Sequence, residues 1–169
     1  MCGIVGIIGK KNFCFDDFDH KLKSSLSSIK HRGPDDSDVF IEKNIGFGHV
    51  RLSIIDLSNN GRQPMLSQNG DCLITYNGEV YNFNELKDEL PIENHNFKSK
   101  TDTEIILEQY LHFGVSTFEK LNGMFAFALF DRKNQSVFLV RDRLGIKPLF
   151  YQIYQNQLIF SSEVRPLTN

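Results

Sequence analysis

The chain has 169 residues, of which 40% are hydrophobic and 24% are charged, and this composition fits one globular domain spanning residues 1–169. The net charge is -2 and the basic residues are scattered, so we expect neither a nucleic-acid partner nor an acidic membrane surface. No apolar run approaches the roughly 20 residues that cross a membrane, and the N-terminus lacks the features of a signal peptide. We therefore expect a cytoplasmic protein.

The cysteines and histidines give no indication of a disulfide framework or a metal centre. Cys2, Cys14 and Cys72 show no CxxC spacing, and in a reducing compartment we expect all three to be thiols. The five histidines have no cysteine or carboxylate at the spacing of a metal site. We therefore expect no bound metal.

The hydrophobic pattern predicts mostly strands in the first half of the chain. Residues 2–9 form a short apolar run that predicts a buried N-terminal strand. Residues 16–33 then carry apolar side chains at helical spacing and end at a glycine, which predicts a helix. Glycine, asparagine and serine separate three further predicted strands, at 38–42, 45–54 and 72–79.

The second half predicts helices first and then strands. A short helix is expected over 82–90, ended by Pro91, and a longer one over 101–114, with a capping box between Thr101 and Glu104. Four predicted strands follow, at 124–131, 136–142, 149–154 and 157–163. Residues 124–130 and 137–140 are continuously apolar, which predicts strands buried on both faces. This pattern indicates packed sheets with helices covering the outside.

Cys2 is chemically unusual because only the initiator methionine precedes it. If Met1 is removed, one residue carries both a thiol and an α-amine, groups with reference pKa values of about 8.5 and about 7.7–8.0. The amine can then accept the thiol proton, as in other N-terminal nucleophiles. The alternative is a small buried side chain in an N-terminal strand, which is the commonest fate of a free cysteine.

Three other polar features each have two interpretations. Arg51 could hold a carboxylate by two parallel hydrogen bonds, or could be a surface charge. The Asn77-Gly78 pair could supply the donors of an oxyanion hole, or could form a tight turn. Asp102 could bind an ammonium group, or could simply favour the first turn of a helix. Arg32, in a Gly-Pro turn, could be an ordinary surface charge.

Nine sequence blocks, in this order along the chain, resemble those of one known family and include the residues discussed above. They are MCGIVGI, KHRGPDDS, GHVRLSIIDLS, GRQPM, YNGEVYN, SKTDTEIIL, LNGMFAFALFD, RDRLGIKPLFY and FSSEVRPL. From residue 2 to about residue 167 the chain resembles the glutaminase domain of glutamine-hydrolysing asparagine synthetases. Those domains are class II glutamine amidotransferases of the N-terminal nucleophile hydrolase type. The resemblance implies an α+β fold, a four-layer αββα sandwich of two mainly antiparallel sheets.

The resemblance also implies catalytic roles. Cys2 matches the nucleophile that attacks the side-chain amide of glutamine and releases ammonia through a thioester. Asn77 and Gly78 match the oxyanion-hole positions, and Arg32 matches a supporting residue close to the nucleophile.

Further positions match residues that bind the substrate glutamine. Arg51 matches the residue that holds the α-carboxylate, and Glu79 and Asp102 match those that hold the α-ammonium. Leu52 and Ile54 match a stretch whose backbone lines the pocket, and Asn77 and Gly78 contact substrate as well.

Partners and cofactors follow from the same resemblance. It implies an ATP-dependent synthetase domain, normally on the same polypeptide, that uses the ammonia to amidate aspartate, and it allows for a homodimer of the full-length enzyme. The pyrophosphate loop of such domains, Ser-Gly-Gly-x-Asp-Ser, is absent from this sequence. We therefore expect no cofactor in this chain, with ATP and Mg²⁺ needed only by the synthetase domain. The alternatives are a sugar or peptide acceptor, or a non-catalytic docking module of the same fold.

Overall fold

The computed structural model describes residues 1–9, 15–53, 58–91 and 97–168. The first half contains β1 (Gly3–Ile8), α1 (Phe15–Ser28), η1 (Lys30–Arg32), β2 (Asp36–Glu42), β3 (Ile45–Arg51), η2 (Asn59–Gly61), β4 (Met65–Leu66) and β5 (Cys72–Val80). The second half contains α2 (Phe83–Asp88), α3 (Asp102–Phe113), η3 (Gly114–Ser116), α4 (Thr117–Lys120), β6 (Gly123–Asp131), β7 (Ser136–Arg141), β8 (Phe150–Tyr154), β9 (Gln157–Ser161) and η4 (Arg165–Leu167).

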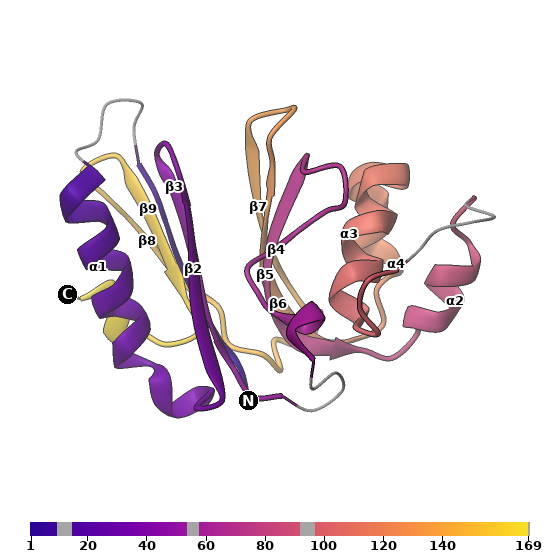
Figure 1. Ribbon diagram of the computed structural model, residues 1–169, viewed down its shortest axis with the longest axis horizontal. Helices are drawn as coiled ribbons and strands as arrows, with labels where there is room; N and C mark the ends of the chain where they lie inside the picture. Colours follow the sequence, from indigo (N-terminus) through magenta and orange to yellow (C-terminus); the bar gives the residue numbers. More distant parts are fainter. Residues whose placement is uncertain (10–14, 54–57, 92–96, 169) are drawn as a thin grey trace.

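Two antiparallel sheets form the centre of the molecule. One sheet has the strand order β2-β3-β1-β9-β8 and the other β4-β5-β6-β7. Figure 1 shows the sheets face to face, with α1 outside the first and α2, α3 and α4 outside the second. The expected αββα sandwich is therefore confirmed.

Three apolar layers explain why the central strands are apolar on both faces. Along β1, Ile4 packs between the sheets, whereas Val5 and Ile7 pack beneath α1. Along β6, Phe130 belongs to the layer between the sheets and Phe127 to the layer beneath α3. Because each of these strands is covered on both faces, polar residues do not alternate with apolar ones along it.

One local prediction holds in part and another was wrong. Both faces of β7 pack against the core, but residues 137–140 are only half-buried because β7 is an edge strand and lacks a neighbour on one side. The capping box at α3 does not form, since the Thr101 side chain makes no capping hydrogen bond. The Glu104 carboxylate instead accepts hydrogen bonds from the backbone N–H groups of Lys98 and Ser99, which precede the helix, at 2.9 and 2.7 Å.

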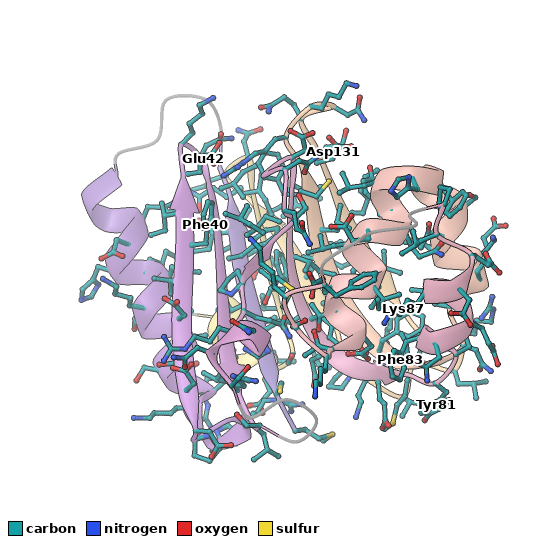
Figure 2. The ribbon with its side chains drawn as sticks, turned by 45° about the vertical axis from the view of Figure 1, so that its right-hand side comes forward. Phe40, Glu42, Tyr81, Phe83, Lys87 and Asp131 are labelled. Atoms are coloured by element: carbon teal, nitrogen blue, oxygen red, sulfur yellow. The ribbon has the colours of Figure 1, made fainter. Side chains whose placement is uncertain are left out.

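An ion pair joins the two sheets at one end of the sandwich. Arg132, which follows β6, binds the Glu42 carboxylate at the end of β2 and lies over the Phe40 ring. Figure 2 shows Glu42 and Asp131 near the top of the molecule and Tyr81 near the bottom. Figure 1 places the N-terminus at this lower end, between the two sheets. Residue 2 therefore lies at the end of the sandwich away from the Arg132–Glu42 pair.

Gly6 is the tightest point of the central strand. It pairs with Phe47 on one side and Phe160 on the other, and these rings meet edge to face at 5.4 Å between centroids. A Cβ at Gly6 would lie 2.2 Å from two ring carbons of Phe160. The glycine therefore provides the space that the two rings fill.

We expect Gly6→Ala to lower the free energy of unfolding by about 1–3 kcal/mol, because the added methyl group overpacks the core. Denaturant unfolding would measure the loss. The double variant Gly6→Ala/Phe160→Leu should lose less than the sum of the two single losses, since the leucine vacates the contested space. Additive losses would contradict this account of the glycine.

Candidate active site

A cavity of about 250 Å³ opens where the N-terminus meets the ends of β3, β5 and α3. Its walls carry a thiol from Cys2, a guanidinium from Arg51 and an amide from Asn77, together with the carboxylates of Glu79 and Asp102. The fold thus brings together residues that lie up to a hundred positions apart in the sequence. Ile54, which was expected at the same site, lies outside the described residues.

Cys2 is placed by the register of β1 against β3. Gly3 pairs with Val50, so the residue before Gly3 lies beside the end of β3. The Leu52 backbone N–H points at Cys2 Sγ, 3.4 Å away, and the Leu52 carbonyl oxygen lies 3.6 Å from the same sulfur. The backbone of Leu52 therefore lines the cavity next to the thiol, as expected.

Arg32 holds the backbone of Cys2 rather than its thiol. Its Nε donates to the Cys2 carbonyl oxygen at 3.0 Å, and its Nη1 lies 3.2 Å from a carboxylate oxygen of Glu163. Partial burial opposes ionisation of Glu163, but Arg32 and His31 lower the pKa of this carboxyl below its usual value. The Arg32–Glu163 pair thus links Cys2 to the segment after β9.

Arg51 is the last residue of β3 and is only 8% exposed. Its Nη1 donates to the Ser58 carbonyl oxygen at 3.0 Å, which directs the guanidinium along the cavity wall. Gly61 allows this position, because a Cβ there would lie 2.5 Å from Arg51 Nη2. The GRQPM block therefore includes a glycine whose small size leaves room for the arginine.

Asp102 is a buried carboxylate at the start of α3. Its Oδ2 accepts hydrogen bonds from the Tyr76 hydroxyl at 2.5 Å and from the Val80 backbone N–H at 2.9 Å. Burial raises the pKa of Asp102 above its ordinary value, although these hydrogen bonds act in the opposite direction. Glu79, in contrast, is exposed at the mouth of the same cavity.

Asn77 and Gly78 lie within β5, so the alternative of a tight turn is wrong. Asn77 is 2% exposed, and its Nδ2 has no hydrogen-bond partner in the described part of the chain. A buried amide donor without a partner costs free energy, so it commonly marks a site that a ligand completes. Gly78 has a packing role as well, because a Cβ there would lie 2.5 Å from the Met124 carbonyl oxygen of β6.

Several residues of the cavity wall were not predicted from the sequence, including His49, Gln63 and Lys147. Gln63 accepts from the Tyr76 backbone N–H at 2.6 Å and thereby braces β5. Burial lowers the pKa of His49 to about 4, so its ring is neutral at pH 7, with Nε2 3.1 Å from the Tyr76 carbonyl oxygen. The sequence offered one indication for His49: it lies two positions before Arg51 in a predicted strand, so both side chains share one face of the sheet.

Cys72 provides the contrast that makes Cys2 distinctive. It is fully buried in the core beneath α3, and burial, aided by the nearby Asp131 carboxylate, raises the pKa of its thiol to about 12. A thiolate, the reactive form, is therefore inaccessible at this position. Neither Cys2 nor Cys72 forms a disulfide. Within the described ranges, no cluster of histidine, cysteine and carboxylate side chains could hold a metal ion.

Comparison with known protein families gives a match over the entire sequence. The profile described as "Glutamine amidotransferase domain" matches residues 1–169. The chain belongs to this family. The amidotransferase domain is 43% identical to the glutamine-hydrolysing asparagine synthetase 2 of Bacillus subtilis strain 168, over 99% of this chain and 22% of that protein. It is 42% identical to a putative asparagine synthetase of Methanocaldococcus jannaschii, over 98% of this chain and 34% of that protein.

Two further relatives extend the comparison. The amidase chry2 of Gibberella zeae is 42% identical over 86% of this amidotransferase domain and 22% of its own length. A solved structure of glutamine phosphoribosylpyrophosphate amidotransferase from B. subtilis superposes with a TM-score of 0.80 at 20% identity, covering 99% of this chain and 43% of that one. The structural likeness shows a shared fold. The chain spans only about a fifth to a third of the sequence relatives named above.

No helix among the described residues is long and apolar enough to cross a membrane.

The buried charge of Asp102 yields a stability prediction. Because its pKa is raised in the folded state, ionisation at pH 7 opposes folding, and this cost disappears as the pH falls and the carboxyl binds a proton. In Asp102→Asn the amide oxygen still accepts from Tyr76 and Val80. We expect the Tm at pH 7 to rise by about 2–4 °C, equivalent to roughly 1 kcal/mol in a domain of this size. The difference should shrink as the pH falls toward 4, and a lower Tm at pH 7 would contradict this account.

Proposed function

We propose that this chain hydrolyses the side-chain amide of glutamine to glutamate and ammonia, with processed Cys2 as the nucleophile. The observation that carries the proposal is that one cavity contains both an accessible thiol and a buried amide donor on Asn77 that has no partner among the described residues. Acyl transfer needs both, since the thiol attacks the carbonyl carbon and the donor stabilises the oxyanion that develops on the carbonyl oxygen.

The charges of the cavity fit a free α-amino acid. Glutamine carries a carboxylate, an ammonium and a neutral reacting amide, and the cavity presents one type of group for each. Arg51 supplies a guanidinium suited to two parallel bonds with the carboxylate. Asp102 supplies a buried carboxylate and Glu79 an exposed one for the ammonium. A site of this kind discriminates strongly against analogues that lack either charge.

The reaction proceeds in two steps that balance without a cofactor. The α-amine of Cys2 accepts the thiol proton, and the thiolate attacks the side-chain carbonyl carbon. The tetrahedral intermediate collapses with cleavage of the carbon–nitrogen bond, and the leaving nitrogen takes the proton from the amine and departs as ammonia. Water then attacks the thioester, which restores the thiol and releases glutamate.

The ammonia would supply an ATP-dependent synthetase domain. This part of the proposal draws on the relatives, several of which are named glutamine-hydrolysing asparagine synthetases and are much longer than this chain. Aspartate is then the acceptor, and ATP and Mg²⁺ belong to the synthetase domain. The match to amidases of similar identity keeps a different acceptor as the second candidate. A cytoplasmic location and a homodimer of the full-length enzyme complete the proposal.

We expect Cys2→Ala to abolish glutamate release from glutamine, a loss of at least about a thousandfold in kcat, because the nucleophile is removed. The Tm should change by less than about 2 °C, since the thiol contributes little core packing. Cys72→Ala is the matched control: it removes a buried thiol and should lower the Tm while keeping measurable activity in the folded fraction. Glutaminase activity in Cys2→Ala would refute the proposal.

Asp102→Asn separates binding from chemistry. We expect kcat/KM for glutamine to fall by about a hundredfold through KM, because a neutral amide replaces the charged partner of the substrate ammonium. Enzyme assay and isothermal titration of glutamate binding would both report this loss. An unchanged KM would remove Asp102 from the binding site.

A further inference from the structure

Lys147 directs a buried ammonium into the active-site cavity. The residue is only 7% exposed and lines the same cavity as Cys2. In the described part of the chain its ammonium has one hydrogen-bond partner, the thioether sulfur of Met1, at 3.4 Å. A thioether is a weak acceptor. The Lys147 ammonium therefore lies in a nearly buried position with one weak contact.

The loop before Lys147 fixes this position. The Asp142 carboxylate accepts hydrogen bonds from the backbone N–H groups of Phe125, Leu144, Ile146 and Lys147. Burial alone would raise the pKa of Asp142, but these donors lower it below its usual value. Arg141 Nε in turn donates to the Lys147 carbonyl oxygen at 2.7 Å. Because both backbone groups of Lys147 are held, its side chain enters the cavity from a fixed point.

Removal of Met1 changes what Lys147 faces. The thioether leaves with the methionine, and the new chain terminus is the α-amine of Cys2, one residue from the sulfur that the lysine touched. Two amines that share a small cavity cannot both be protonated without a Coulomb cost.

We infer that Lys147 is a positioning residue that keeps the α-amine of processed Cys2 neutral and ready to accept the thiol proton. It does so by placing its ammonium at the same end of the cavity. This inference rests on the proposed function, because it concerns the base of that reaction.

The other charged groups near the α-amine also affect its protonation, and Lys147 acts against some of them. Arg32 from η1 binds the Cys2 carbonyl oxygen but is paired with Glu163. Arg51 from β3 is assigned to the substrate carboxylate. Glu79 from β5 and Asp102 from α3 are negative when ionised and favour a protonated amine. Lys147 opposes those two carboxylates, so in its absence the amine should stay protonated to a higher pH.

The test compares Lys147→Met with Lys147→Arg in chains whose loss of Met1 is verified by intact mass. We expect the acidic limb of the pH profile of kcat/KM to move upward by about 0.5 pH units or more in Lys147→Met, with the alkaline plateau within about threefold of the parent. Lys147→Arg should keep the limb within about 0.2 units because the charge remains. Arg143→Met is the matched control, since it removes a cation of the same loop that does not line the cavity.

A second readout needs no turnover. In chains labelled with ¹⁵N-cysteine, the ¹⁵N shift of the Cys2 α-amine can be titrated directly, and its midpoint should rise in Lys147→Met alone. Equal midpoints in the parent and Lys147→Met would overturn the inference, as would a lowered plateau or a raised KM without movement of the limb. If the parent releases no glutamate from glutamine, the proposed function fails, and the amine titration still decides the role of the lysine.

Discussion

The pairing of β1 with β3 and β9 along its two edges is the constraint on which the site depends. Chain termini usually fray, but Gly3–Ile8 is a central strand with a neighbour on each side and an apolar layer on each face. The register Gly3↔Val50 places Cys2 beside the end of β3, where Arg51 and Leu52 follow. The proposed nucleophile thereby gains a fixed position, which displacement reactions require.

Several residues of the site also destabilise the folded protein. Asp102 is buried with a raised pKa, and Asn77 buries an amide donor that has no partner in the described ranges. Lys147 places its ammonium against a thioether. A buried charge or a buried donor without a good partner lowers the stability of the fold. In the proposed function, the ammonium of glutamine would pair with Asp102 and its side-chain carbonyl oxygen would accept from Asn77. The core, whose central strands are covered on both faces, stabilises the fold enough to offset these losses. Lower stability in exchange for activity is common at functional sites.

Hydrophobic pattern and motif order allowed most of this to be predicted from sequence. The central strands and the two long helices were correct, because continuous apolar runs and helical spacing report burial directly. The capping box failed because Glu104 found donors in the preceding loop, which only the tertiary path of that loop reveals. The two residues of β4 and the four of α4 are too short for periodicity to detect. The burial of β7 was overestimated, because sequence does not show which strand lies at an edge.

The site could be predicted in its residues but not in its geometry. Five predicted residues converge on one cavity, namely Cys2, Arg51, Asn77, Glu79 and Asp102. Arg32 contacts the backbone of Cys2. Their roles in binding and catalysis remain predictions. His49 and Lys147 escaped notice because a single histidine or lysine between apolar residues looks like a surface charge. Only the fold shows that both face the cavity.

The central claim is that Cys2, once Met1 is removed, is a competent nucleophile in a glutamine site. Intact mass spectrometry before and after treatment with a diazo-ketone analogue of glutamine tests it most directly. The account predicts a chain lighter by one methionine that gains a single adduct on Cys2, blocked by excess glutamine. A processed chain that takes up no label, or takes it up equally in the presence of glutamine, would contradict it.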